Sequence, residues 1–234
     1  MSENIFAGLQ KLTLLDFPGK VACTLFTRGC NFRCPFCHNA SLVVRPEEQR
    51  MYGNDEILSF LKKRVGVLDG VAITGGEPTL MNGLYDFIKE IKSLGYAVKL
   101  DTNGTRPEML KRIVNDGLVD YVAMDIKNSR EKYAYTCGLP DSYDISKIEE
   151  SKNFLMEGKV DFEFRTTVAK PFHEESDFIK IAEWLKGSEK YFLQQFKDSG
   201  DIIGDSVSAY SDAEMKRFLD ILLPFVPNAQ LRGV

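Results

Sequence analysis

The chain has 234 residues, 44% of them apolar, and a formal net charge of −4. This is enough for a sizeable core, so we expect a single domain over residues 1–234. No long basic run is present, which argues against a nucleic-acid partner. The apolar runs are too short to cross a membrane, and residues 1–4 are acidic and lack the features of a signal peptide. We therefore expect a cytoplasmic protein without membrane contact.

Short apolar runs alternate with helical patterns along the chain. The runs predict six strands, at residues 21–27, 71–74, 97–102, 121–126, 160–168 and 191–195. Their nearly continuous apolar character is typical of parallel strands that are buried on both faces. The helical pattern predicts helices near residues 57–68, 84–94, 107–117, 145–158, 176–187 and 211–224. Ser176 is the expected cap of the fifth helix, and Ser211 with Glu214 form a capping box for the sixth.

Six strand–helix units in one chain predict an α/β fold, either an open sheet or a six-stranded (β/α)6 partial TIM barrel. An eight-stranded barrel would typically need about 250 residues. Nearly every predicted strand ends in polar or glycine residues that differ from the apolar run before them. Catalytic groups of β/α barrels lie at these strand ends, so the partial barrel is the better prediction.

Cys30, Cys34 and Cys37 form a C-x3-C-x2-C pattern after the first predicted strand. A structural zinc site closes with four protein ligands, and a ferredoxin-type cluster uses four cysteines. Three close thiolates without an obvious fourth indicate an iron–sulfur cluster with one open coordination position. The alternative is a zinc knuckle completed by His38 or by a distant residue.

The two remaining cysteines do not extend this pattern. Cys23 lies inside an apolar run and is expected to be a small core residue. Cys137 lies in a predicted loop, where it is either sensitive to oxidation or without a role. No disulfide framework is indicated.

The cysteine spacing, with Phe36 directly before the last cysteine, resembles the radical S-adenosylmethionine superfamily. The resemblance implies that Cys30, Cys34 and Cys37 hold a 4Fe–4S cluster. It further implies that the amino and carboxylate groups of S-adenosylmethionine chelate the fourth iron. His38 follows the last cysteine and is expected near the cluster.

The segment Gly75-Gly76-Glu77-Pro78 follows the second predicted strand. Two glycines let the backbone approach a ligand closely. A turn would explain the glycines and the proline, but not readily the glutamate between them. The segment resembles the GGEP motif of the same superfamily, which implies that Gly75, Gly76 and Glu77 bind the amino group of S-adenosylmethionine.

Asp101, Thr102, Asp125 and Lys127 lie at the ends of the third and fourth predicted strands. Ordinary loop polarity is one reading. Alternatively, two carboxylates, a hydroxyl and backbone oxygens could hold a hard cation such as sodium or magnesium. The pattern resembles the glycyl-radical activating enzymes. That resemblance implies a monovalent cation bound by Asp101, Thr102, Asp125 and the carbonyl of Ala123, with Lys127 facing the cofactor or substrate.

Arg165 lies on an apolar predicted strand, where an unpaired charge is costly. We expect it to pair with a carboxylate, which belongs either to the cofactor or to a structural Asp or Glu. His173 follows Pro171 in a predicted loop and is expected at the surface.

Residues 8–20 and 193–196 resemble the activating proteins of anaerobic ribonucleotide reductases. Residues 192–196 lack the histidine that the pyruvate formate-lyase activase carries at the end of its last site strand. The resemblance implies an electron from flavodoxin or ferredoxin, cleavage of S-adenosylmethionine, and a glycyl radical on a partner such as anaerobic ribonucleotide reductase. Two alternatives stay open: a radical enzyme acting on a small molecule, as the 7-carboxy-7-deazaguanine synthases do, or a non-catalytic iron–sulfur or zinc module.

Overall fold

The computed structural model describes residues 6–234. Residues 1–4, on which the expectation about a signal peptide depends, lie outside this range. The chain divides into two compact units. Unit 1 holds the chain up to Asn31, Ser41–Ala123 and Lys147–Asp161, and unit 2 holds Phe32–Ala40, Met124–Ser146 and Phe162–Val234. A single domain over residues 1–234 stays a prediction.

Unit 1 contains four strands that neighbour one another in chain order. They are β1 (Phe6–Thr13), β2 (Ala22–Thr27), β3 (Gly70–Gly75) and β4 (Ala97–Thr102). β1 runs antiparallel to β2, whereas β2, β3 and β4 are parallel. The β2–β3 register pairs Thr27 with Gly75, so these two strands end side by side. The loops that follow them, which carry Cys30 and the GGEP segment, therefore leave the sheet at the same edge.

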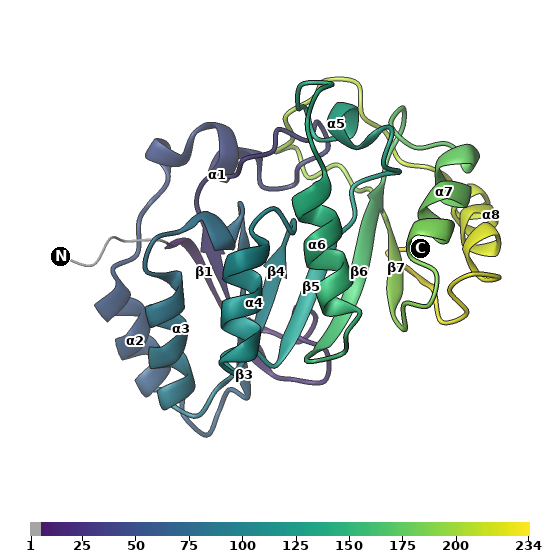
Figure 1. The fold of residues 1–234 in the computed structure, drawn as a ribbon. Coiled ribbons are helices and arrows are strands. Elements are labelled where there is room, and N and C mark those ends of the chain that lie inside the picture. The colour runs from purple at the N-terminus through teal and green to yellow at the C-terminus, as the bar shows by residue number, and fades with distance from the viewer. Residues whose placement is uncertain (1–5) are drawn as a thin grey trace. The chain divides into compact units, whose positions relative to one another are not determined.

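The helices of unit 1 pack apolar faces against these strands. They are α2 (Asn54–Lys62), α3 (Leu84–Ser93) and α4 (Pro107–Asn115), with 3₁₀ turns η1 (Pro46–Glu48) and η2 (Pro78–Leu80) between the strands. In Figure 1, α2 and α3 lie side by side. The rings of Phe6 and Phe87 join β1 to α3 with centroids 5.0 Å apart. α2 is shorter than predicted: it ends at Lys62, Val65 is exposed beyond the helix end, and Gly66 adopts a positive φ of 78°.

The remaining elements belong to unit 2 or pass from one unit to the other along the chain. α1 (Ala40–Val44), β5 (Tyr121–Asp125) and α6 (Ser146–Leu155) each begin in one unit and end in the other. Unit 2 contains α5 (Tyr133–Thr136), β6 (Asp161–Val168) apart from its first residue, α7 (Glu175–Trp184), β7 (Tyr191–Gln195), α8 (Asp212–Leu222) and β8 (Gln230–Arg232). β6, β7 and β8 pair in parallel. α7 and α8 lie side by side (Figure 1), and their Phe178 and Phe218 rings stack with centroids 4.4 Å apart.

The helix caps are partly as predicted. The capping box of Ser211 and Glu214 at the start of α8 is confirmed. The prediction of Ser176 as a cap is wrong, because α7 begins earlier, with Glu174 as its N-cap. The backbone N–H of Glu174 donates to the carboxylate of Asp177 at 2.9 Å, which satisfies a donor that the helix leaves open.

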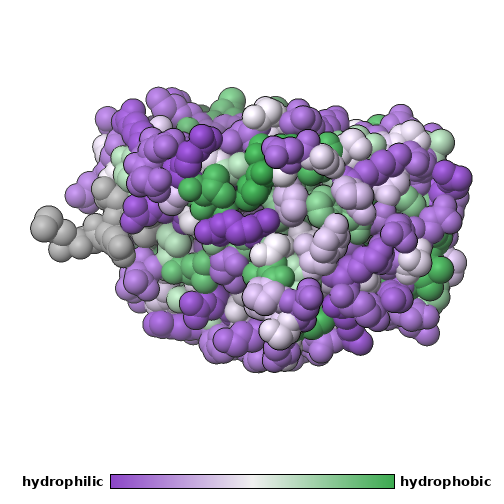
Figure 2. All heavy atoms as spheres, turned by 90° about the horizontal axis from the view of Figure 1, so that it is seen from above, coloured by the Kyte–Doolittle hydropathy of each residue, from purple (hydrophilic) through white to green (hydrophobic). Residues whose placement is uncertain are grey.

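All six predicted strands are confirmed, as β2 to β7, and the class is α/β. The prediction missed two strands, β1 and β8, and two short helices, α1 and α5. β1 has an exposed stretch at Gln10, Lys11 and Leu12, and β8 has only three residues, so neither has a continuous apolar run. None of the helices between residues 6 and 234 combines the length and the apolar character that a membrane crossing requires. Figure 2 shows a face that is largely hydrophilic, with hydrophobic side chains in small groups.

Candidate functional site

In unit 1 the GGEP turn is bound to the loop that carries the first cysteine. The backbone N–H of Gly76 donates to the carbonyl of Thr27 at 2.9 Å, and that of Glu77 donates to the carbonyl of Gly29 at 2.8 Å. A Cβ added to Gly76 would lie 1.8 Å from the Gly29 carbonyl oxygen, so only glycine fits at this approach. The position of Cys30, the next residue after Gly29, is thus set in part by the GGEP turn.

Glu77 is buried and joins the GGEP turn to the end of β4. Its Oε1 accepts from the backbone N–H of Thr79 at 3.1 Å, from the Thr79 hydroxyl at 2.5 Å and from the Thr102 hydroxyl at 2.8 Å. Its Oε2 accepts from the backbone N–H of Asn103 at 2.6 Å. Burial raises the pKa of Glu77, while these hydrogen bonds favour its charged form. Both carboxylate oxygens of Glu77 therefore accept hydrogen bonds within unit 1.

Asn103 is a site residue that the sequence reasoning missed. Its Nδ2 donates to Oδ1 of Asn31 at 2.9 Å and lies 3.8 Å from Sγ of Cys30, within reach of a weak hydrogen bond. It stands directly after Thr102, in a polar strand end that the sequence marked as a candidate. The sequence does carry a signal for Asn103, namely an amide side chain at this polar strand end.

Asp101, a predicted cation ligand, is paired with a lysine of its own strand. The Lys99 ammonium donates to Oδ1 of Asp101, and the Lys99 side chain is 3% exposed. Residues two apart on a strand point to the same face, which explains the pairing. The Asp101 carboxylate therefore has a protein cation as its neighbour.

In unit 2, Cys34 and Cys37 form a tight turn. The backbone N–H of Cys37 donates to the carbonyl of Cys34 at 3.0 Å. A side-chain hydrogen bond with Cys137 lowers the pKa of Cys34, and the charge of Lys127 acts in the same direction. Burial raises the pKa of Cys37. The thiolate is the form that binds metals, so the surroundings of Cys34 favour a ligand role.

Asp125, at the end of β5, is shared by two cations. Its Oδ1 lies 3.0 Å from both Nε and Nη2 of Arg165, and its Oδ2 accepts from Nζ of Lys127 at 2.9 Å. Burial acts to raise the pKa of Asp125, but the charges of Arg165 and Lys127 outweigh it and lower the pKa to about 2. Of the two expectations for Arg165, the structure thus has the arginine paired with a structural aspartate.

His173 is fully buried, and the prediction that it lies at the surface is wrong. Its Nε2 lies 2.8 Å from the carbonyl oxygen of Lys127, its Nδ1 lies 3.3 Å from the backbone nitrogen of Ala169, and Tyr210 donates to its carbonyl. These partners satisfy the imidazole and allow its burial. Burial lowers the pKa of His173.

The two predicted aromatic site residues contact other rings of unit 2. Phe36 packs against Phe172 and His173, with ring centroids 5.5 and 5.9 Å apart. His38 stacks on Phe196 at 5.3 Å with an interplanar angle of 15°. Burial lowers the pKa of His38, which favours the neutral ring.

The predicted site residues are distributed over both units. Unit 1 holds Cys30, Gly75, Gly76, Glu77, Asp101 and Thr102; unit 2 holds Cys34, Phe36, Cys37, His38, Asp125, Lys127 and Arg165. Within the described part of either unit, no three His, Cys, Asp or Glu side chains are grouped as they are around a bound metal ion. Both the cluster ligands and the cation ligands predicted from the sequence draw on the two units, and they stay predictions.

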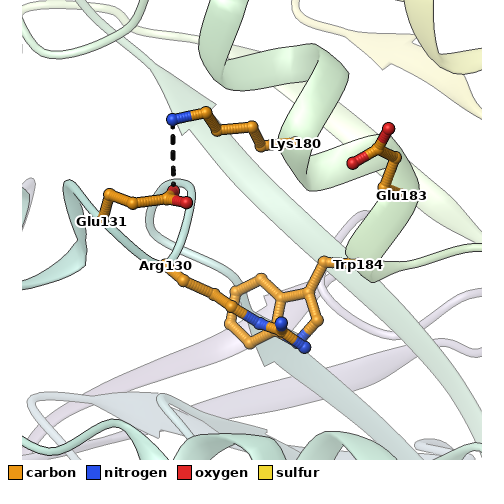
Figure 3. A pocket seen from close by; sticks show the side chains of 5 residues that line it. All are labelled: Arg130, Glu131, Lys180, Glu183 and Trp184. Atoms are coloured by element: carbon orange, nitrogen blue, oxygen red, sulfur yellow. Dashed lines mark ion pairs between the residues drawn. The ribbon is translucent and has the colours of Figure 1, made fainter.

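Two pockets lie outside this set. One, of about 180 Å³, is lined by Arg130, Glu131, Lys180, Glu183 and Trp184 (Figure 3). In it Lys180 pairs with Glu131 at 3.5 Å, and the Arg130 guanidinium lies 5.3 Å from the Trp184 ring centroid. The other, of about 320 Å³, lies between η2 and α4 and includes Thr79, Arg106 and Arg112. Neither pocket contains a predicted site residue.

Comparison with known proteins identifies the family. The family model described as "Radical SAM superfamily" matches residues 24–185. The chain is 30% identical to the "putative glycyl-radical enzyme activating enzyme MJ1227" of Methanocaldococcus jannaschii, over 99% of this chain and 97% of that protein. It is also 31% identical to the GTP 3′,8-cyclase of Helicobacter pylori, over 68% of this chain and 50% of the cyclase.

Solved structures agree in fold. Streptococcus suis SuiB bound to S-adenosylmethionine matches with a TM-score of 0.68 at 14% identity, over 88% of this chain and 48% of SuiB. The chain thus spans about half the length of that structure, and the likeness concerns the fold alone. Radical SAM membership implies a 4Fe–4S cluster and S-adenosylmethionine as cofactors, and it confirms the predicted partial-barrel class. The chain belongs to the radical SAM superfamily.

Proposed function

We propose that this radical SAM enzyme is an activating enzyme that generates a glycyl radical on a partner protein, namely an anaerobic ribonucleotide reductase. The observation that carries the proposal is the similarity to MJ1227, which extends over 99% of this chain and 97% of that protein. The similarity to the GTP cyclase covers only half of the cyclase. The proposed enzyme acts in the cytoplasm as a single domain over residues 1–234.

The donor chemistry of the chain fits the cofactors that the family implies. We propose Cys30, Cys34 and Cys37 as ligands of the 4Fe–4S cluster, because thiolates are the ligands such clusters use. Three thiolates leave one iron for S-adenosylmethionine. The lowered pKa of Cys34 and the amide of Asn103 beside Cys30 support this assignment.

When bound, the cluster and S-adenosylmethionine supply a one-electron reductive cleavage of S-adenosylmethionine into methionine and a 5′-deoxyadenosyl radical. In the proposal, a hydrogen atom then passes from a glycine Cα of the partner to this radical. The proposed electron donor is a flavodoxin or a ferredoxin. The protein supplies binding, orientation and exclusion of water.

The remaining predicted residues serve binding and orientation in this proposal. Gly75 and Gly76 bind the amino group of S-adenosylmethionine through their backbone, and Glu77 holds the turn through its bonds to Thr79, Thr102 and Asn103. Phe36 and His38 stand beside the cluster. Lys127 and Arg165, both fixed by Asp125, offer positive charge to the cofactor or substrate.

A monovalent cation is part of the proposal, on the resemblance to glycyl-radical activating enzymes. Its proposed ligands are Asp101, Thr102, Asp125 and the carbonyl of Ala123. Such a cation must share Asp125 with Lys127 and Arg165, and it must share Asp101 with Lys99.

The test begins with anaerobic reconstitution of the protein with iron and sulfide. Dithionite and S-adenosylmethionine are then added, and 5′-deoxyadenosine is measured beside a Cys34→Ala control. Formation by the wild type alone is expected. Electron paramagnetic resonance of an added anaerobic ribonucleotide reductase should then show a glycyl radical. Cleavage without that signal would contradict the activating role and favour a small-molecule substrate.

A further inference from the structure

Cys137, which the sequence left as either sensitive to oxidation or without a role, lies beside a proposed cluster ligand. It directly follows α5 and is fully buried, with its backbone N–H bonded to the carbonyl of Tyr133 at 3.0 Å. Its side chain shares a hydrogen bond with that of Cys34, which acts to lower the pKa of Cys34, and Cys34 is itself 6% exposed. The two residues are far apart in the sequence, so the contact is a product of the fold.

The backbone around Cys137 is fitted closely to the cysteine loop. The N–H of Arg33 donates to the carbonyl of Cys137 at 2.8 Å. Gly138 has a positive φ of 64°, and a Cβ there would lie 2.6 Å from the carbonyl oxygen of Arg33. The turn after α5 therefore requires glycine both for its conformation and for its approach to the loop.

Aromatic packing holds the same two segments together. Phe32 contacts Tyr133 and Tyr143 edge to face, with ring centroids 6.3 and 6.2 Å apart. Residues 32 and 33 directly precede Cys34, so the α5 segment contacts the cysteine loop through rings, backbone and thiol. These contacts fix the position of the Cys137 sulfur relative to the Cys34 sulfur.

We propose that Cys137 is a positioning residue whose S–H donates to the sulfur of Cys34 while Cys34 ligates the cluster, and that this bond makes the cluster easier to reduce. The inference rests on the cluster assignment of the proposed function. Hydrogen bonds to ligand sulfurs are among the factors that set the reduction potential of iron–sulfur clusters. Reduction adds negative charge to the cluster, and a donor at a ligand sulfur stabilises that charge.

The test measures the reduction potential of the reconstituted cluster by anaerobic redox titration followed by electron paramagnetic resonance. Four proteins are compared: wild type, Cys137→Ala, Cys137→Ser and Cys23→Ala. Alanine removes the donor, while serine keeps an O–H donor and guards against a folding defect of the alanine variant. Cys23→Ala is the matched control, because Cys23 is equally buried but lies on β2 in unit 1.

The expected result is a more negative potential for Cys137→Ala than for the wild type, with Cys137→Ser at or above the wild-type value and Cys23→Ala unchanged. An unchanged potential in Cys137→Ala, or an equal shift in Cys23→Ala, would overturn the inference while the proposed function stands. If the wild type holds no cluster, the proposed function fails, and the inference fails with it.

Discussion

Arg165 approaches Asp125 with two nitrogens, Nε and Nη2, that both lie 3.0 Å from the same oxygen, Oδ1. This leaves Oδ2 for Lys127, at 2.9 Å. Two cations thus share one anion, so the group keeps one net positive charge. Such a charge suits an anionic ligand group, and the carboxylate of S-adenosylmethionine is the one that the proposed function supplies.

Asp125→Asn should destabilise the protein, because it leaves two partly buried cations without their shared anion. Removing one partner of a buried ion pair typically costs about 3 kcal/mol or more. Urea denaturation of the cluster-free, reduced protein at neutral pH measures this loss. An unchanged free energy of unfolding would mean that Lys127 and Arg165 find other partners in the variant.

The stability contributed by Asp125 should depend on pH. Its pKa falls from 3.8 to about 2 on folding, so the unfolded chain binds more protons between these values. The contribution, about 2 kcal/mol, is therefore complete above about pH 5 and is lost as the pH falls toward 2. Denaturation at several pH values should show this component in the wild type and not in Asp125→Asn. Equal acid sensitivity of the two proteins would refute it.

Replacing any one of Cys30, Cys34 and Cys37 with alanine should abolish cluster binding. Three thiolates are needed for three irons, so no single variant should keep the iron content or the absorbance at about 400 nm that is typical of such clusters. Cys23→Ala is the control, because burial raises the pKa of Cys23 to about 12 and makes its thiol a poor ligand. Full iron in any of the three variants would remove that cysteine from the ligand set.

Gly76→Ala should be more damaging than alanine at another glycine of unit 1. The new Cβ would lie 1.8 Å from the Gly29 carbonyl oxygen, so the GGEP turn and the cysteine loop must separate, at a cost of about 3 kcal/mol. Gly83→Ala is the matched control: it has open space around it and a φ of 81°, so it costs only the backbone strain of about 1 kcal/mol. Thermal unfolding ranks the two variants, and equal losses would contradict the packing argument.

Glu77→Gln should weaken both folding and binding of S-adenosylmethionine. Glutamine keeps one acceptor oxygen where Glu77 uses two, so either Asn103 or the Thr79 and Thr102 donors lose their partner. An unsatisfied buried donor costs about 1–3 kcal/mol. Isothermal titration with S-adenosylmethionine, alongside denaturation, separates the two effects. Weaker binding at wild-type stability would mean that the Glu77 carboxylate contacts the cofactor directly.

Exchanging sodium and potassium for tetramethylammonium tests whether a bound monovalent cation supports the binding of S-adenosylmethionine. This ion is too large for a site built from carboxylates and a hydroxyl, so the affinity for S-adenosylmethionine should fall in the wild type. The affinity of Asp125→Ala should be low in either salt. If the wild type binds equally well in both salts, the affinity does not depend on a metal ion, and the cation drops out of the proposal.

The elements that could be predicted from the sequence are those with a local signal. β3 and β5 are short apolar runs, and the cysteine spacing lies within eight residues. β1 gave no such signal, since it carries an exposed polar stretch at Gln10 and Lys11. β1 runs antiparallel to β2, and such a strand can leave one face to water, so it lacks the continuous apolar run of a parallel strand that is buried on both faces.

The site could be predicted as a set of residues but not as a set of partners. Arg165 and Asp125 are 40 residues apart, and His173 and the Lys127 carbonyl are 46 apart. A sequence pattern does not report which of several carboxylates or carbonyls a side chain meets after folding. For the same reason the sequence could only mark Cys137 as either sensitive to oxidation or without a role.

The burial of His173 limits the acid–base chemistry of the chain. Its imidazole is held by the backbone of Lys127 and Ala169 on both ring nitrogens, and its lowered pKa keeps the ring neutral near pH 7. Backbone groups therefore occupy both ring nitrogens, and neither nitrogen is left for a ligand. The sequence has only two histidines, which leaves His38 as the single imidazole available for proton transfer.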